Sequence, residues 1–396
     1  ASRVLSAGRV RSADQQTLTL TKLTAELRET GKGHTAVLVS GDTGFCSLAK
    51  TLVRDFSGLY QMELIPGISS IQYLSAKIRM PYDDAKLLSL HGKTGNIVAQ
   101  AAYNPKLFVL TGGANNVRQI CLDLYNHGLE NVELVVGERL SYPDEQITGG
   151  KVRQLKGLDF DELSVLYIEN LYAVDPALPL NDEDFIRSEV PMTKQEVRWV
   201  SVQKLAVQSK DVIYDIGAGS GSVSVELARK ATNGFVYAFE KKAEACELIR
   251  ANRSKHGAFN IDVIHGEVPD AMDGLPAPDK VFIGGSSGNL DSILEKLVAL
   301  NPQVRVVANA VTIQSLGQIV EGFEKYGLAD ADIVCMNVAR AKKVGRYDMM
   351  IAQNPVYIVS AGANASANAS ASSDVDAKGS ANAATATARR SKRRPK

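Results

Sequence analysis

The chain has 396 residues, enough for about two to three domains. Its residues are 45% hydrophobic and 22% charged, which is typical of globular proteins. No apolar run reaches the roughly 18–20 residues of a membrane span, and the first residues lack the pattern of a secretory signal. The net charge of +1 argues against a protein that binds nucleic acid over its whole surface.

The four cysteines are far apart in the sequence and form no CxxC pair; they are Cys46, Cys121, Cys246 and Cys335. This usage predicts reduced thiols in a cytoplasmic compartment. Zinc sites need clustered ligands, and the five histidines are scattered. We therefore expect no metal site.

An α/β pattern fills the first part of the chain. Residues 35–42 form an apolar strand pattern that ends in a Gly-Asp turn, and residues 45–56 follow with helical spacing. Strand-to-helix turns recur at 60–70 and 107–128, and two more apolar runs follow before residue 170. This alternation predicts a largely parallel sheet covered by helices, which we assign to a domain of residues 1–174.

A segment rich in proline and acidic residues, 175–190, predicts a linker to a second α/β block at 191–360. The strand patterns of this block lie at 212–216, 235–240, 261–267, 280–285 and 304–311. Two more strand patterns, within 331–340 and 347–359, predict a hairpin at the sheet edge. The second block therefore has the order of elements of a Rossmann-like fold.

Residues 361–396 form a tail of different character. Up to residue 388 it is low-complexity Ala/Asn/Ser, which buries too little apolar surface to fold, so we predict disorder. It ends in RRSKRRPK, and from Asp374 onward its net charge is +5, which leaves about −4 on the rest of the chain. The basic end is interpreted as a solubilising or non-native extension, with an address signal or an anion-binding arm as alternatives.

A glycine-rich turn in the second block indicates a nucleotide-type ligand. The stretch YDIGAGSGSVSVELARK, residues 214–230, runs from a short strand through Gly217, Gly219 and Gly221 into a helix. This GxGxG spacing differs from the GxGxxG of dinucleotide binders, and no GK[ST] follows. Asp215 would repel a pyrophosphate but suits an ammonium group, such as that of S-adenosylmethionine.

Polar and small residues at the next strand ends support this interpretation. Glu240 ends a strand about 20 residues after the loop, where a carboxylate can accept from ribose hydroxyls. Gly266 and Glu267 end the next strand, where Glu267 could accept from an adenine amino group. Gly284 and Gly285 leave room at the carboxyl edge of the sheet, where ligands of open α/β sheets bind. The order predicts an S-adenosylmethionine-dependent methyltransferase, with a dinucleotide-binding domain as the main competitor.

Longer motifs extend this prediction to a family. PMTKQEVRWVSVQKL, DIGAGSGSVSVELA, HGEVPDAM, FIGGSSGNL and GRYDMMIAQNPV resemble the decarboxylating precorrin-6B C15-methyltransferase domain of cobalamin biosynthesis. VLVSGDTGFCSLAKTL, ELIPGISSIQYLSAKIRMPYDDAKLLSLHG, VLTGGANNV and YIENL resemble the tetrapyrrole methylase that modifies C5. The fusion resembles the bifunctional precorrin-6Y C5,15-methyltransferase family.

The resemblance implies two methyl transfers from S-adenosylmethionine to a corrinoid macrocycle, at C5 and C15, and loss of carbon dioxide from the C12 acetate. It implies a class I methyltransferase fold for 191–360. Glu267 departs mildly from the family, which more often has Asp at that turn. The opening ASRVLSAGRVRSADQQ resembles the segment after the family's first glycine-rich loop, so we expect the first domain to be incomplete at its start.

The resemblance also implies site residues in each domain. In the first domain the cofactor loops would contain Gly41, Asp42, Thr43, Pro66, Gly67, Ser69 and Ser70. His91 is a candidate proton acceptor for C5 methylation, or else a structural histidine. In the second domain Thr193 would lie beside the cofactor, although it could also be a helix N-cap with Glu196.

The substrate carries several carboxylates, which predicts cationic clamps. Candidates are Arg340, Lys342, Lys343 and Arg346, which could equally form a solvated basic turn. Other hypotheses are a methyltransferase of RNA or protein, for which no Asn-Pro-Pro-Tyr motif follows the fourth strand, and a non-catalytic corrinoid-binding protein. The family is commonly oligomeric, so we expect a homo-oligomer with no nucleic-acid or membrane partner.

Overall fold

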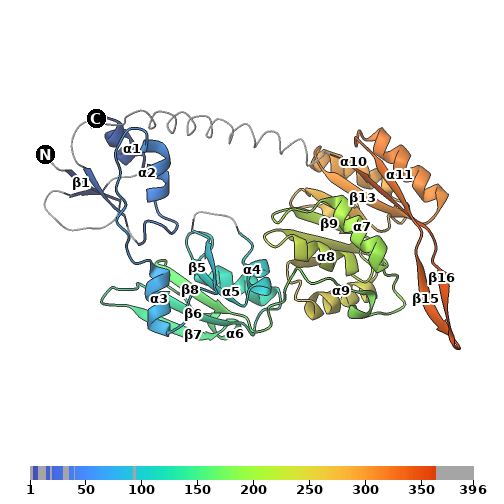
Figure 1. The fold of residues 1–396 in the computed structure, drawn as a ribbon, viewed down its shortest axis with the longest axis horizontal. Coiled ribbons are helices and arrows are strands. Elements are labelled where there is room, and N and C mark those ends of the chain that lie inside the picture. The colour runs from blue at the N-terminus through green and yellow to red at the C-terminus, as the bar shows by residue number, and fades with distance from the viewer. Residues whose placement is uncertain are drawn as a thin grey trace, which may run out of the picture. The chain divides into compact units, whose positions relative to one another are not determined.

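A computed structural model describes residues 3–7, 15–17, 20–29, 35–39, 41–91 and 95–362. Most of the predicted disordered tail, from residue 363 on, lies outside the described residues, as do parts of the opening segment. The chain divides into two compact units (Figure 1). Unit 1 comprises residues 1–95 and 104–171, and unit 2 comprises residues 96–103 and 172–396. The domain boundaries at 174 and 191 stay a prediction.

Unit 1 contains two sheets in its described part. The smaller sheet is parallel, in the order β2-β1-β3, from β1 (Arg3–Ala7), β2 (Gln15–Thr17) and β3 (Thr35–Val39). The larger sheet has the order β4-β5-β8-β6-β7, from β4 (Lys86–Ser89), β5 (Lys106–Leu110), β6 (Glu133–Glu138), β7 (Gln146–Lys151) and β8 (Ser164–Glu169). The helices are α1 (Leu20–Glu29), α2 (Ala49–Phe56), α3 (Ser70–Ile78), α5 (Val117–Asn126) and α6 (Val152–Leu155).

The prediction of a largely parallel sheet is wrong for the larger sheet of unit 1. Only β4 and β5 run parallel there, whereas β8 pairs antiparallel with both β5 and β6, and β6 pairs antiparallel with β7. The strand expected within 60–70 is also absent: the chain between Tyr60 and Ser70 has no regular secondary structure. The sequence of a buried apolar strand such as β8 does not indicate whether the strand is parallel or antiparallel to its neighbours, because its direction depends on pairing with residues distant in the chain.

Unit 2 has one large sheet in the order β11-β10-β9-β12-β13-β17-β14. Its strands are β9 (Val212–Ile216), β10 (Phe235–Glu240), β11 (Ile261–His265), β12 (Lys280–Ile283), β13 (Arg305–Ala310), β14 (Asp332–Met336) and β17 (Val356–Ala361). The first five strands of that order are parallel, as predicted, and β17 pairs antiparallel with β13 and β14. The sheet therefore matches the predicted Rossmann-like fold.

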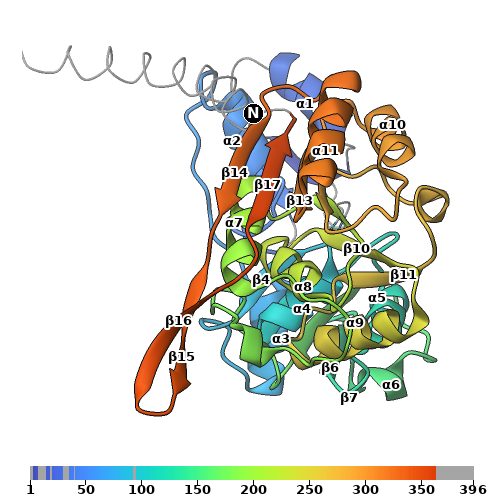
Figure 2. The same cartoon turned by 90° about the vertical axis from the view of Figure 1, so that its right-hand side faces the viewer.

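The expected edge hairpin is more elaborate than predicted. β14 and β17 join the main sheet, and between them the chain forms a separate antiparallel hairpin of β15 (Ala339–Val344) and β16 (Tyr347–Ala352). Figure 2 shows this hairpin extending away from β14 and β17. Each strand pattern of the sequence thus contains two strands, because the chain leaves the sheet and returns to it.

Helices cover both faces of the unit 2 sheet. The described helices of unit 2 are α4 (Ile97–Tyr103), α7 (Gln195–Leu205), α8 (Ser222–Lys230), α9 (Ala243–Lys255), α10 (Leu290–Leu300) and α11 (Ile313–Lys325). Short 3-10 turns lie at Asp182–Asp184 and Asp270–Met272. Helices α7, α8 and α9 pack on one face of the sheet, and α10 and α11 pack on the other.

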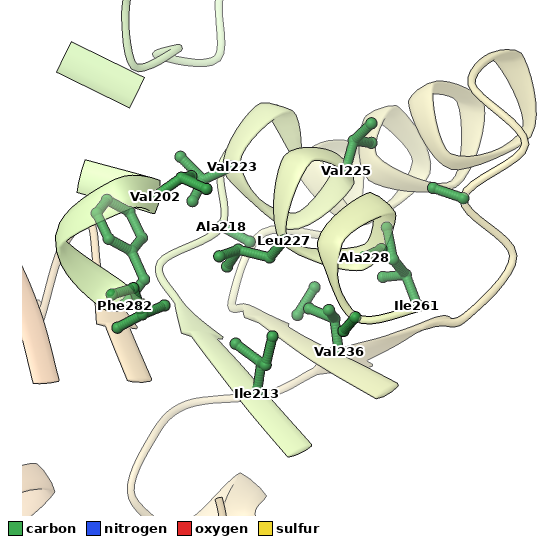
Figure 3. Close-up of a cluster of buried hydrophobic side chains, with 14 of the residues drawn as sticks. Val202, Ile213, Ala218, Val223, Val225, Leu227, Ala228, Val236, Ile261 and Phe282 are labelled. Carbon is green, nitrogen blue, oxygen red and sulfur yellow. The ribbon is translucent and has the colours of Figure 1, made fainter. Parts of the chain in front are cut away.

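Alternation along the strands decides which core each side chain joins. Ile213 and Phe282 point to the cluster under α7 and α8, whereas Tyr214 and Val281 belong to the cluster under α10 and α11. Figure 3 shows Val202 of α7 and Phe282 of β12 among the side chains of the first cluster. Both faces are buried, so the strands read as continuous apolar runs. The carboxyl ends of these strands are where polar and glycine residues gather.

Candidate functional site

The glycine loop between β9 and α8 is held in a conformation that only glycine adopts easily. Gly217, Gly219 and Gly221 have φ of +70°, +56° and +78°. The backbone N–H groups of Gly217 and Ala218 donate to the carbonyl of Phe239 at 3.1 Å each, which ties the loop to the end of β10. A Cβ on Gly217 would lie 2.6 Å from the carbonyl oxygen of Gly285, so the two glycine turns touch.

Glu240 fastens the same loop from the end of β10. Its Oε2 accepts from the Gly219 N–H at 3.0 Å, and its Oε1 accepts from the N–H groups of Lys241 and Lys242 at 2.9 and 3.1 Å. An ionised carboxylate has about four acceptor positions, so about one is left on Oε2. Glu240 therefore has a structural role that the sequence pattern did not indicate, together with capacity to bind one more donor.

A cavity of about 950 Å³ opens over these loops at the carboxyl edge of the sheet. The predicted residues that line it are Thr193, Gly217, Gly219, Glu240, Gly266, Glu267, Gly284 and Gly285. They come from four strand ends and from the segment before α7, and the fold brings them together. Opposite the loop, the carbonyl of Pro191 would lie 2.9 Å from a Cβ on Gly219. The segment before α7 is thus part of the cavity wall.

Glu267 lies at the exposed rim of this cavity. Its Oε1 accepts from Asn289 Nδ2 at 3.5 Å, and the same Asn289 nitrogen donates to the Val268 carbonyl at 3.1 Å. Gly221, in contrast, does not line the cavity: a Cβ there would lie 3.0 Å from the Ile249 side chain, so this glycine allows α8 to pack on α9.

Asp215 lies inside the fold and not in the cavity wall. It is fully buried, its Oδ2 accepts from the Ser224 hydroxyl, and its Oδ1 has no hydrogen-bond partner in the described part of the chain. Burial raises the pKa of Asp215 to about 7, although the hydrogen bonds from Ser224 act in the opposite direction. This buried position does not favour the direct contact between Asp215 and an ammonium group that we expected. Asp215 can act on a ligand only through the electric field of its carboxyl group.

We expect Asp215→Asn to remove a pH-dependent cost of folding. The folded carboxyl has a raised pKa, so the native state binds more protons than the unfolded chain between about pH 4 and pH 7, and stability falls across this range. The shift corresponds to roughly 4 kcal/mol. Urea unfolding at pH 5 and pH 8 should therefore show a larger gain for Asp215→Asn at pH 8. Asp270→Asn, on an exposed turn, is the surface control, and an equal effect of Asp215→Asn at both pH values would contradict the prediction.

Several residues of the cavity were not singled out in the sequence. Lys194, Lys241 and Lys242 line it and supply positive charge. Asn309, near the carboxyl end of β13, also lines it, and its Oδ1 accepts from the buried hydroxyl of Ser201 at 3.1 Å. The rule that ligands bind at strand carboxyl ends could have found Asn309, but no local pattern identifies Ser201, because it is 108 residues away.

The predicted cationic clamps do not line this cavity as the structure describes it. Arg340 forms an ion pair with Glu196 of α7 at 2.5 Å, and Arg346 donates to the Tyr347 hydroxyl at 2.7 Å. Lys343 is exposed on β15 and is paired in register with Asp348. The hairpin register also places Arg340 and Lys343 on opposite faces, because their positions differ by three. A substrate-binding role for these residues stays a prediction.

The two predicted cofactor loops of unit 1 lie against each other. A Cβ on Gly67 would lie 2.5 Å from the carbonyl oxygen of Gly41 and 4.0 Å from the Asp42 Cα, so the Gly41–Thr43 turn touches the Pro66–Gly67 turn. Ser69 caps α3: its hydroxyl accepts from the Gln72 N–H at 3.1 Å, and its own N–H donates to Gln72 Oε1 at 2.7 Å. Ser70 is the first residue of α3. The fold thus brings the two loops together at one place.

His91 packs on the next glycine turn of unit 1. Its Nδ1 lies 3.3 Å from the Thr111 carbonyl oxygen, and a Cβ on Gly112 would lie 2.1 Å from this nitrogen. A ring held by a backbone carbonyl fits the structural role, which was the alternative to proton transfer.

The described residues contain no cluster of three or more potential metal ligands. None of the helices described is long and apolar enough to span a bilayer.

Comparisons with known proteins match both units. Residues 184–362 match the family described as "Precorrin methyltransferase domain", and residues 6–156 match "Tetrapyrrole (Corrin/Porphyrin) Methylases". The "Precorrin-6Y C(5,15)-methyltransferase [decarboxylating]" of a Sinorhizobium species is 30% identical over 318 residues, which are 78% of this chain and 75% of that protein.

Two further relatives match about half of the chain. A "Probable cobalt-precorrin-6B C(15)-methyltransferase (decarboxylating)" of Pyrobaculum calidifontis is 40% identical to this chain. The match covers 48% of this chain and 96% of that protein. The crystal structure of a precorrin-6y C5,15-methyltransferase from Geobacter metallireducens GS-15 is 39% identical, covers 47% of this chain and 97% of its own, and has a TM-score of 0.45. On the match that spans both units, this chain belongs to the decarboxylating precorrin-6Y C(5,15)-methyltransferase family of cobalamin biosynthesis and is an S-adenosylmethionine-dependent C-methyltransferase.

Proposed function

We propose that the cavity of unit 2 is the site at which precorrin is methylated at C15 and loses the carboxyl group of its C12 acetate. The observation that carries this proposal is the glycine cradle: Gly217 and Gly285 approach so closely that a Cβ would meet a carbonyl oxygen at 2.6 Å. The family matches support a separate methylation reaction for each unit, because the C15-methyltransferase relative aligns with about half of the chain and the tetrapyrrole methylases match residues 6–156.

The residues of the cavity fit S-adenosylmethionine. The glycine turns leave backbone room for an adenosyl group, the remaining acceptor position of Glu240 suits a ribose hydroxyl, and the rim at Glu267 and Asn289 suits the adenine edge. When bound, this donor supplies an electrophilic methyl group. Thr193 and the wall before α7 would border its methionine part. These assignments stay proposals for each residue.

The other residues of the cavity suit a substrate with several carboxylates. Lys194, Lys241 and Lys242 can pair with acidic side chains of the macrocycle. The Asn309 side-chain amide lies 3.1 Å from the Ser201 hydroxyl, which also donates to the Val197 carbonyl at 2.8 Å, and the rest of this amide can hydrogen-bond to the substrate. Because the carbon to be methylated is already electron-rich, alignment and exclusion of water are the main tasks of the chain. Electrons released as carbon dioxide leaves can pass into the conjugated ring.

Mass spectrometry after incubation with precorrin-6B and S-adenosylmethionine tests this function. We expect a product that has gained a methyl group and lost the mass of carbon dioxide. Methylation without decarboxylation would contradict the decarboxylating role, and transfer of labelled methyl to RNA or protein, with none to precorrin, would support the alternative substrates.

Unit 1 is proposed to methylate C5 from the loops at Gly41–Thr43 and Pro66–Ser70, with the macrocycle as its substrate. Selective loss of C15 methylation in Glu240→Ala, with C5 methylation retained, would separate the two sites. We further propose a homo-oligomer that works in the cytoplasm without a nucleic-acid partner, which size-exclusion chromatography with light scattering and cell fractionation can test.

A further inference from the structure

A fully buried arginine lies behind the cavity wall of unit 2. Arg198, the fourth residue of α7, is 0% exposed. One terminal nitrogen donates to the Thr193 carbonyl at 2.9 Å and to Asp182 Oδ1 at 3.1 Å, and the other donates to the Leu180 carbonyl at 2.9 Å. Its Nε lies 3.4 Å from Glu226 Oε1 on α8. The guanidinium also stacks over the Phe185 ring, 4.7 Å from its centroid.

These contacts join both ends of one segment to α7. The segment runs from residue 180 to residue 193, and its last part, Val190–Thr193, lines the cavity. Arg198 holds it at Leu180 and Asp182 on one side and at Thr193 on the other. Pro191, between these points, faces Gly219 so closely that a Cβ would meet its carbonyl at 2.9 Å. The distance between wall and glycine loop therefore depends on where Arg198 holds the segment.

The chemistry of this cluster favours a geometric role over a simple contribution to the core. Burying a guanidinium with the carboxylates of Asp182 and Glu226 carries a large desolvation cost, and well-packed apolar residues often stabilise a core as well or better. A guanidinium is, however, the side chain whose planar set of donors can fix two carbonyls and a carboxylate at once. The cluster thus specifies the position of a backbone segment.

We propose that Arg198 is a positioning residue of the methyl-donor site, which clamps residues 180–193 to α7 and so sets the wall Val190–Thr193 against the glycine loop. The proposal rests on the function proposed for this cavity. Its consequence is that Arg198 controls donor affinity through Thr193 and Pro191, with no contact to the ligand itself.

Unit 2 contains a matched control for this role. Arg229 of α8 is also buried, at 6% exposure, and donates to the carbonyls of Asp175 and Leu178 at 2.7 Å each. It therefore holds residues 175–178, which precede the 180–193 segment, by hydrogen bonds to backbone carbonyls. Neither Asp175 nor Leu178 lines the described cavity. Loss of Arg229 should affect stability but leave the wall at Pro191 in place.

The experiment compares Arg198→Lys with Arg229→Lys in the full chain. A lysine reaches fewer of the acceptors, so both variants should unfold at lower urea concentrations. The fluorescence of Trp199, the single tryptophan of the sequence and the neighbour of Arg198, reports whether α7 is formed. Calorimetric titration with S-adenosylhomocysteine then measures affinity, and turnover at saturating donor measures kcat.

We expect Arg198→Lys to weaken S-adenosylhomocysteine binding by roughly tenfold and to raise the donor KM similarly, with kcat within about twofold of the wild type. Arg229→Lys should leave both constants within about twofold. Should Arg198→Lys not fold, Asp182→Asn keeps the arginine and weakens the clamp, with an expected loss of affinity of about threefold.

Wild-type affinity in both Arg198→Lys and Asp182→Asn would overturn the proposal, as would equal losses of affinity in Arg198→Lys and Arg229→Lys. The function proposed for the cavity fails by a different result, since a wild-type protein that does not bind S-adenosylhomocysteine in unit 2 would refute the donor site itself.

Discussion

Glu240→Ala is expected to weaken S-adenosylhomocysteine binding to unit 2 by about 100-fold while the domain stays folded. The substitution removes a carboxylate acceptor for the ligand and leaves the Gly219 N–H without its partner, so the loop loses one of its three hydrogen bonds to the end of β10. Charge-assisted hydrogen bonds of this kind contribute roughly 1.5–3 kcal/mol each, which is consistent with a loss of this size. Calorimetric titration measures it directly.

Two variants sharpen this test. Glu240→Gln keeps one carbonyl acceptor, so it should bind with an affinity between those of the wild type and Glu240→Ala. Glu244→Ala removes an exposed carboxylate from the first turn of α9, close by in sequence, and should bind as the wild type does. An affinity of Glu240→Ala within about threefold of wild type would remove Glu240 from the site.

Gly217→Ala is expected to destabilise unit 2 by about 3 kcal/mol and to abolish donor binding. Its Cβ would lie 2.6 Å from the Gly285 oxygen and 2.9 Å from the Gly285 nitrogen, both backbone atoms that cannot move aside alone. The positive φ of +70° adds a cost of roughly 1 kcal/mol for any residue with a side chain. The two glycine turns must separate, and their separation deforms the base of the cavity. Urea unfolding and calorimetric titration measure the two effects.

Gly274→Ala isolates the contribution of the clash. Gly274 has a similar φ of +77°, but a Cβ there would meet no described atom within 4 Å. This control should lose only about 1 kcal/mol of stability and keep its affinity for S-adenosylhomocysteine. If both alanine variants were destabilised equally, the close packing of Gly217 on Gly285 would not be what requires glycine at this position.

The second unit could be predicted well from sequence because its fold and site follow local rules. Its central strands are apolar on both faces, so they appear as separate runs, and each strand end carries a glycine or an acid that a ligand can use. The sequence pattern therefore indicated Glu240 and Gly285, and both line the cavity. It did not indicate the separate hairpin β15–β16. The apolar pattern of β14 continues into β15, and that of β16 continues into β17, so each pair appears as one strand in the sequence.

The first unit shows the limit of the same rules. β8 is as apolar and buried as a parallel strand, yet it pairs antiparallel with β5, which precedes it by more than fifty residues. Strand direction depends on how the intervening chain crosses the sheet, and a run of apolar residues carries no record of that path. The contact between the Gly41 and Gly67 turns likewise brings together residues that no spacing rule connects.

The succession of elements, the glycine loop with its neighbouring acids and the family motifs could all be predicted, since each is contained in a short stretch of sequence. The burial of Asp215, the hydrogen bond from Gly219 to Glu240 and the contact of Arg198 with the cavity wall became visible only in the folded chain. Burial and buried hydrogen bonds depend on partners distant in sequence, so the packing around a charged side chain decides whether it binds a ligand or holds the backbone.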